Sequence, residues 1–483
     1  MDRKVAGPEA SNFKHQVGNI VNLRETLKNS RVSLFFFLRT FYSKRKEVIR
    51  MAAPYHKRFD LISNSLTSSH FHSIARFPDS PNSFTRTRKF PLNEVIYSFL
   101  FKRGLTATME VYHYLKRKGS SVMTLSKQAF LSQRKKVNPE AFRFLNLQYL
   151  SHFYTQDTPK TWHNYLVFAI DGSRMEVPNS KENRLFFSQN GNRFGETSVR
   201  AQTSGLMDVF NAFLIDLQID SLHVGEKNLA KKNLLSSESI PFQAPRLVLF
   251  DRGYPSLDLI HFIEKQKLSY LIRIPSTIYQ KERAQLTSLD SSVFLSCTYS
   301  RLRTMKRVEP ELAKDFEANK GIMTRMIQLP LENGQMNVFM TNLPATITRE
   351  EILELYKKRW AIEKLWQTVK NKLKIEQVSG KSPVCVYQDF LAQSLVYNMV
   401  QDVMSHLNQK ETKKKINENI AIGLWKDQLI DIVLEKDDKE KLLRFKKLEE
   451  DILRAVYLPR DLQRNKRKYK HHNKYKQNQK PSF

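Results

Sequence analysis

Four polar residues have a spacing that would place them along one side of a helix. Tyr356, Arg359, Glu363 and Lys370 stand at relative positions 0, 3, 7 and 14, and at about 100° per residue their directions are about 0°, 300°, 340° and 320°. One carboxylate beside a phenol and two cations suits a groove where a metal ion and phosphate groups meet. The alternative is a surface helix with an ordinary ion pair between Arg359 and Glu363.

Two aspartates favour the first interpretation, because each follows an apolar run typical of a buried strand. Asp171 comes after residues 165–170, and Asp251 comes after residues 247–250. A carboxylate that ends a buried strand is costly unless it lies at an open sheet edge and has a function there. Together with Glu363, these acids could converge on two divalent ions.

Such an arrangement would serve phosphoryl transfer, because one ion activates the attacking water or hydroxyl and the other stabilises the leaving oxygen. We therefore expect Asp171, Asp251 and Glu363 to be both catalytic and metal-binding. Magnesium prefers hard oxygen ligands, so the expected cofactor is two Mg²⁺ ions, with Mn²⁺ as a substitute. The two cysteines, Cys297 and Cys385, have no nearby Cys or His at the spacing of a zinc site.

The elements that must position these residues predict an α/β domain over 160–375. Strands are expected at 165–170, at 205–219 as a pair around Asn211, at 247–250 and at 268–274, with helices at 227–235 and 256–266. Residues 276–346 predict a β-rich insertion, with a hairpin turn at Asn333-Gly334. Thr348 and Glu351 then form a capping box that opens one long helix over 349–374.

The flanking regions differ from this domain in composition. Residues 1–83 are poorly informative, residues 84–153 predict a small basic helical unit that binds DNA, and residues 376–459 predict a C-terminal helical region. Residues 460–483 hold nine basic residues against one acid, which predicts a disordered tail that binds phosphates.

The overall charge points to a polyanionic partner. The chain has 80 basic and 48 acidic residues, a formal net charge of +32, and nucleic acid is the commonest partner of such a surface. Charge alone does not identify an activity. The most apolar early run covers only residues 32–38, far short of a membrane span, so we expect no membrane association.

The combination of motifs resembles the DDE transposases of bacterial insertion sequences, in the family-four subgroup marked by the Y-(2)-R-(3)-E-(6)-K signature. The four helix residues reproduce that spacing, and the aspartates stand in Ile-Asp171-Gly-Ser and Phe-Asp251-Arg-Gly-Tyr, as in the family. The resemblance covers roughly residues 84–400. It implies an RNase H-like catalytic core with a β-rich insertion, a preceding helical domain and a basic helical C-terminal region.

The resemblance also implies an activity and its partners. Such enzymes cut their element out of DNA, commonly through a hairpin on the element end, and join the freed 3′ hydroxyls to target DNA. The expected partners are double-stranded DNA, as terminal inverted repeats and target, and a second copy of the chain in a homodimer. The expected location is the bacterial cytoplasm, associated with the nucleoid.

Individual residues inherit roles from the resemblance. Tyr356, Arg359 and Lys370 would grip phosphates at the cleaved end. Apart from the resemblance, Arg252 is a weaker candidate for DNA contact whose alternative role is to shape the turn at the rim of the site, and Trp366 could equally stack on DNA or close the core. Some relatives stack a flipped base on an aromatic residue of the insertion, where this chain has no tryptophan. The candidates that could replace it are Tyr279, Phe294, Tyr299 and Phe339.

Two other function classes fit part of the pattern. A decayed or domesticated DNA-binding protein would keep the basic surface without catalysis, although the intact acids count against it. A metal-dependent DNA nuclease would share the metal site but would not require two defined DNA ends.

Overall fold

The structure, a computed structural model, describes residues 53–86, 90–119, 125–191, 197–330, 336–408 and 414–458. The predicted tail at 460–483, the Asn333-Gly334 turn and most of the extension before residue 53 therefore lie outside the described residues. Among the helices that are described, none has the length and apolarity needed to cross a membrane.

A nine-stranded, mostly antiparallel sheet forms the centre of the molecule. Its path runs β2-β3-β1-β5-β6-β9-β8-β7. Strand β4 pairs with residues 201–207 of β3, further along that strand than the part that pairs with β2. Strands β1, β5 and β6 are parallel to one another, and the remaining pairs are antiparallel. The strands are β1 (Leu166–Val177), β2 (Gln189–Gly191), β3 (Thr197–Asp208), β4 (Leu214–Ser221), β5 (Arg246–Phe250), β6 (Ser269–Ile274), β7 (Asp290–Ser296), β8 (Gly321–Pro330) and β9 (Met336–Thr341).

The segment predicted as a β-rich insertion contains three strands, and its strand β9 pairs with β6, so β9, β8 and β7 extend the central sheet. The prediction needs one correction, because the segment is also partly helical, with α11 (Gln280–Ala284), α12 (Tyr299–Val308) and α13 (Pro310–Asn319). Pro310 at the first position of α13 and the buried pair Ala313 and Phe316, three residues apart, favour that helix.

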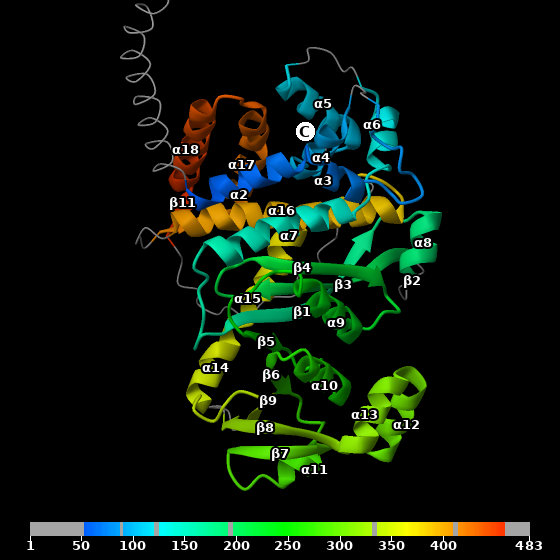
Figure 1. Ribbon diagram of the computed structural model, residues 1–483, viewed down its shortest axis with the longest axis vertical. Helices are drawn as coiled ribbons and strands as arrows, with labels where there is room; N and C mark the ends of the chain where they lie inside the picture. Colours follow the sequence, from blue (N-terminus) through cyan, green and yellow to red (C-terminus); the bar gives the residue numbers. More distant parts are fainter. Residues whose placement is uncertain are drawn as a thin grey trace, which may run out of the picture.

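Helices cover the sheet unevenly (Figure 1). Helices α9 (Glu226–Ser237) and α10 (Leu257–Lys265) pack beside the strands that they connect, while α7 (Glu140–Gln156) and α16 (Pro383–Leu407) lie across the β4 end. Beyond α7 and α16 lies a helical body made from both ends of the described chain. Its helices are α2 (Pro54–Ser65), α3 (Ser69–Ile74), α4 (Leu92–Leu100), α5 (Ala107–Arg117), α6 (Lys127–Arg134), α17 (Glu418–Leu434) and α18 (Asp438–Arg454). A two-stranded sheet of β10 (Lys415–Ile416) and β11 (Val456–Tyr457) lies beside them.

Helix α16 joins this helical body to the sheet through buried polar contacts. The Asn398 side chain accepts a hydrogen bond from the Leu214 amide at 2.7 Å and donates one to the Leu214 carbonyl at 2.8 Å, which satisfies backbone groups at the start of β4. Asp389 forms ion pairs with Arg134 at 2.8 Å and Lys102 at 3.0 Å. All three ionic side chains are buried, so α16 fixes the N-terminal helices in place.

The predicted long helix after Thr348 is divided in the structure. It consists of α14 (Arg349–Lys358), α15 (Trp360–Gln367) and a five-residue π-helical turn η1 (Thr368–Lys372), with Arg359 at the junction of the first two. The capping box of Thr348 and Glu351 is confirmed at its start. A π-helical turn rotates the following residues relative to a regular α-helix, and such turns are frequent at functional sites.

Candidate active site

The register of the parallel strands brings the two aspartates together. Ala169 of β1 pairs with Leu249 of β5, and two residues further along come Asp171, still within β1, and Asp251, the first residue after β5. Because side chains alternate along a strand, residues two apart point to the same face. The aspartates therefore lie side by side at the point where β5 ends.

The expectation that the first strand ends at Asp171 was wrong. Strand β1 continues to Val177, and its pairing with β3 runs from Phe168 to Val177. The fully buried part of the strand ends before Asp171, because residues 166–170 are buried and Asp171 is half-buried. The physical reason is that β5 stops at Phe250, so the continuing part of β1 has lost its parallel neighbour on that side.

The third acid, Glu363, is held by its predicted helix neighbour. The Arg359 guanidinium donates a hydrogen bond to the Glu363 carboxylate at 2.7 Å. The i,i+4 pair expected for a surface helix does form, but the Arg359 side chain is only 9% exposed, so the pair is not an ordinary surface contact. Burial leaves Arg359 Nε without a hydrogen-bond partner among the described residues.

Tyr356 and Lys370 connect the same stripe to the two aspartate-bearing strands. The Tyr356 hydroxyl donates a hydrogen bond at 3.4 Å to the carbonyl of Phe250, the residue before Asp251. Lys370 donates to the Ser173 hydroxyl at 2.6 Å and to the Arg174 carbonyl at 2.7 Å, just beyond Asp171. Tyr356 therefore contacts the end of β5, and Lys370 contacts the middle of β1, two and three residues after Asp171.

The two weaker DNA-contact candidates lie in different environments. Arg252 is exposed in the turn after β5, where its side chain is accessible. Trp366 is buried, and its ring lies against Gly205, which pairs with Asp171 across β1 and β3. Of the two roles considered for Trp366, its burial favours closing the core.

The pKa of Asp171 responds to the charged groups around it. Burial raises the pKa of Asp171 to about 6, the Arg359 guanidinium lowers it, and the carboxylates of Glu363, Asp251 and Glu226 raise it. Glu226, the first residue of α9, was missed by the sequence analysis. An acid in the first turn of a helix is an ordinary feature that stabilises the helix dipole, so its position gave no reason to single it out.

The donor set fits an oxygen-ligated divalent cation by chemistry. The negative charges of Glu363, Asp251 and Glu226 raise the pKa of Asp171, and a bound cation would reduce this repulsion between carboxylates. Carboxylate oxygens suit Mg²⁺ or Mn²⁺ rather than zinc. Within the described parts of the chain, however, no three His, Cys, Asp or Glu side chains are grouped tightly enough to hold a metal ion. The ion pair with Arg359 holds Glu363 in its present position.

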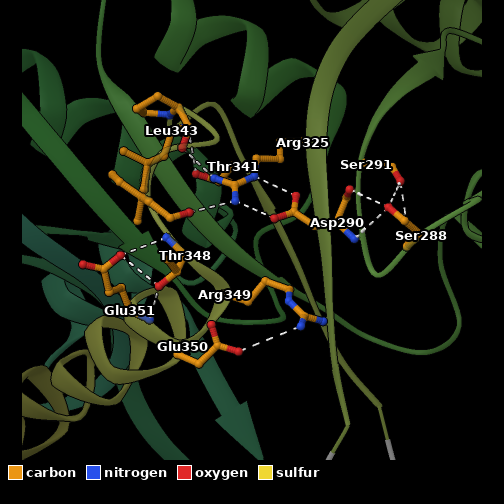
Figure 2. A network of polar contacts seen from close by, with 12 residues as sticks. Ser288, Asp290, Ser291, Arg325, Thr341, Leu343, Thr348, Arg349, Glu350 and Glu351 are labelled. Carbon is orange, nitrogen blue, oxygen red and sulfur yellow. Dashed lines mark hydrogen bonds and ion pairs between the residues drawn. The ribbon is translucent and has the colours of Figure 1, made fainter.

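A polar network fixes the start of α14 against the end of the sheet (Figure 2). Arg325 of β8 binds the Asp290 carboxylate through two nitrogens, at 2.8 and 2.5 Å. The same guanidinium donates to the carbonyls of Pro344 and Ile347, at 2.7 and 2.8 Å, in the loop before Thr348. The insertion strands therefore set where the helix with the polar stripe begins.

The four aromatic candidates for base stacking are placed very differently. Phe339 is fully buried and packs against Tyr356, with ring centroids 4.8 Å apart. Tyr279 is 6% exposed, lies under the Arg301 guanidinium and lines a cavity of about 890 Å³ that also touches Glu226. Phe294 and Tyr299 are exposed, by 43% and 81%. Burial therefore removes Phe339 from the candidates.

Several basic residues of the region 84–153 are engaged inside the protein. Lys102 and Arg134 are buried against Asp389. Arg103 and Arg117 both pair with Asp427 of α17, each at 2.5 Å. These four cations contribute to the packing of the helical body, so a DNA-binding surface on these helices must use other residues.

Comparison with known proteins identifies one family for the part of the chain that carries the acids. Residues 162–399 match the model of a family described as "Transposase DDE domain". No curated protein matches the chain. Among solved structures, the chain is similar to a cryo-EM structure of the "piggyBac transposase synaptic complex with hairpin DNA", with a TM-score of 0.43 and 11% identity over 83% of this chain and 86% of that one.

The family match is informative because of where it falls. It spans just under half of the 483 residues and includes Asp171, Asp251 and Glu363. The structural likeness is too distant to add to this assignment. The segment that carries the three acids is thus similar to the transposase DDE domain, a match that supports a DDE transposase.

Proposed function

We propose that this protein is a DNA transposase that cleaves DNA at the ends of an insertion sequence and joins those ends to target DNA. The observation that carries the proposal is the meeting of Asp171 and Asp251 on adjacent parallel strands, with Glu363 electrostatically coupled to Asp171, inside the segment that matches the transposase DDE domain. The net charge of +32 supports a DNA partner.

The arrangement of strands supports an RNase H-like core. The order β4-β3-β1-β5-β6, with the first three strands antiparallel and the last three parallel, places Asp171 on the central strand and Asp251 after its parallel neighbour. This is the order that the resemblance to insertion-sequence transposases implies. The signature spacing of the helix residues supports the family-four subgroup.

The proposed site residues divide into acids that hold divalent cations and cations that hold phosphate. Asp171, Asp251 and Glu363 would bind Mg²⁺, which when bound lowers the pKa of an attacking water or hydroxyl and stabilises the leaving oxygen. Arg359 and Lys370 lie at the same face and would orient the phosphate, while the Tyr356 hydroxyl positions the backbone beside Asp251. DNA that offers its phosphates to Arg359 would compete with Glu363 for the guanidinium.

The wider proposal includes cut-and-paste transposition through a hairpin and a homodimer that pairs two ends. Both elements rest on the resemblance of the sequence motifs. The protein would act on terminal inverted repeats and on target DNA.

Incubation with linear DNA that contains the genomic sequences on both sides of the coding region tests the reaction class. In the presence of Mg²⁺, products in which an end is joined to a second DNA molecule support a transposase. Cleavage without joining would identify a nuclease, and tight DNA binding without any product would identify a protein that has lost catalysis.

A further inference from the structure

The Glu226 side chain extends from the start of α9 to the strand that carries Asp171. Its carboxylate accepts a hydrogen bond from the Gln202 side chain at 3.2 Å. A Cβ atom on Gly172 would lie only 2.8 Å from the Glu226 Cδ atom. A glycine next to Asp171 therefore leaves the space that this carboxylate occupies, which gives a physical reason for glycine in the Asp171-Gly-Ser motif.

A second observation at the same place is a buried hydroxyl without a partner. Tyr254 is 2% exposed, and among the described residues its hydroxyl has no hydrogen-bond partner. The Tyr254 amide donates a hydrogen bond to the Asp251 carbonyl at 3.1 Å, so the phenol belongs to the turn that carries Asp251. Burial raises the pKa of Tyr254, and the carboxylates of Asp171, Glu226 and Asp251 raise it further. A buried hydroxyl is costly when unpaired, which indicates a site built to receive a polar ligand.

The four acids are not equally available to a cation. Glu363 is already neutralised by Arg359 at 2.7 Å. Asp171, Asp251 and Glu226 form no ion pair with any described residue. The ammonium group of Lys227, the residue next to Glu226, donates a hydrogen bond to the Pro255 carbonyl at 3.5 Å. Glu226 is therefore a carboxylate next to the part of β1 that carries Asp171, in contact with the position of Gly172, and no described cation balances its charge.

We propose that Glu226 supplies a fourth carboxylate to the divalent-cation site of Asp171, Asp251 and Glu363, with the Tyr254 hydroxyl bordering it. The inference rests on the proposed function, since it concerns the same metal site. It assigns to α9 a direct part in holding the cation, and it explains the glycine at position 172, where a Cβ atom would collide with the Glu226 carboxylate. Hard oxygen ligands of this kind suit Mg²⁺ and Mn²⁺.

Binding of Mn²⁺ to the full chain without DNA, measured by electron paramagnetic resonance of free Mn²⁺, tests the proposal. We compare the natural protein with Asp171→Asn, Glu226→Gln and Glu238→Gln. Glu238 is the matched control, because it is an exposed glutamate at the opposite end of the same helix. The expected result is that Glu226→Gln weakens Mn²⁺ binding at least tenfold and Glu238→Gln leaves it unchanged.

The outcomes distinguish failure of the Glu226 proposal from failure of the metal site itself. If Asp171→Asn abolishes binding while Glu226→Gln binds as the natural protein does, the fourth ligand is overturned and the metal site stands. If the natural protein binds no Mn²⁺, the proposed metal site itself fails and the inference fails with it.

A second set of variants tests the same point without depending on a single substitution. Gly172→Ala adds a methyl group that forces the Glu226 carboxylate to move, so it should weaken Mn²⁺ binding. In a Glu226→Ala background the same methyl meets no carboxylate, so the double variant should bind no worse than Glu226→Ala alone. Additive losses would contradict the proposal, and circular dichroism confirms that each variant is folded.

Discussion

The Arg359 guanidinium donates a hydrogen bond to the Glu363 carboxylate at 2.7 Å. The residue proposed to bind phosphate therefore binds the residue proposed to hold the metal ion. Both residues are also coupled to Asp171, whose pKa Arg359 lowers and Glu363 raises. The free protein therefore keeps one of its acids neutralised internally. Binding of DNA and metal would exchange this contact for contacts to phosphate and cation.

Arg359→Ala should change metal binding and DNA processing in opposite directions. Removing a cation that competes for Glu363 should tighten Mn²⁺ binding in the absence of DNA by several fold, while cleavage of DNA falls by roughly tenfold or more. Titration of Mn²⁺ and a cleavage assay measure the two effects. Arg349→Ala, at the start of α14, is the control that removes a cation without removing this pair. Unchanged Mn²⁺ affinity in Arg359→Ala would show that Glu363 does not take part in metal binding.

Lys370→Ala should weaken DNA binding on every sequence and reduce its salt dependence. If Lys370 contacts one phosphate, the slope of log K against log salt should fall by about 0.9. Because Lys370 also binds Ser173 and the Arg174 carbonyl in the free protein, a small loss of thermal stability should accompany the change. Lys265→Ala, an exposed lysine on α10, serves as the control. An unchanged salt slope would refute a phosphate contact.

Arg325→Ala should impair catalysis from a position away from the acids. The substitution removes the contacts that hold Asp290 and the carbonyls of Pro344 and Ile347, and breaking a buried ion pair costs about 3–5 kcal/mol. Hydrogen exchange should therefore increase in the loop before Thr348 and in the first turn of α14. Lys314→Ala, which breaks an exposed pair with Glu311, should leave exchange there unchanged. Normal protection in Arg325→Ala would mean that the network does not position this helix.

Asp389→Asn should destabilise the helical body in a pH-dependent way. Burial raises the pKa of Asp389, but the Arg134 guanidinium and then the Lys102 ammonium outweigh this effect and hold it at about 2, below its usual 3.8. A depressed carboxylate pKa contributes stability that is present above pH 3.8 and is lost as the pH falls through 2. At pH 7 the variant leaves two buried cations unpaired, and the expected loss in the free energy of unfolding is about 3 kcal/mol.

Urea unfolding of the natural protein and Asp389→Asn at pH 7 and at pH 3 measures this difference, which should shrink at the lower pH. Asp438→Asn, an exposed aspartate of α18, should unfold at the same urea concentration as the natural protein. Equal midpoints for Asp389→Asn at pH 7 would refute the role assigned to the buried pair.

Local patterns were sufficient to predict most elements around the site. The apolar runs before Asp171 and Asp251 correspond to β1 and β5, and the capping box of Thr348 and Glu351 opens α14. These predictions succeed because burial of a strand and capping of a helix depend on neighbouring residues in the chain.

Features that depend on contacts distant in sequence could not be predicted in the same way. The continuation of β1 past Asp171 depends on where β5 stops, and the extension of the sheet by β9 depends on pairing with β6. Glu226 approaches the strand that carries Asp171 only because α9 packs against β3, and no pattern in the chain around residue 226 indicates that packing. Residues 276–346 were predicted as β-rich because the helical pattern around Pro310 is short.

The most direct test of the central claim is the joining of DNA ends by the natural protein and by Glu363→Gln in the presence of Mg²⁺. The substrate is linear DNA with the genomic sequences that flank the coding region, and Glu354→Gln, an exposed glutamate of α14, is the control. The account predicts joined products with the natural protein and with Glu354→Gln, and none with Glu363→Gln despite unchanged DNA binding. Joined products formed by Glu363→Gln at the natural rate would contradict it.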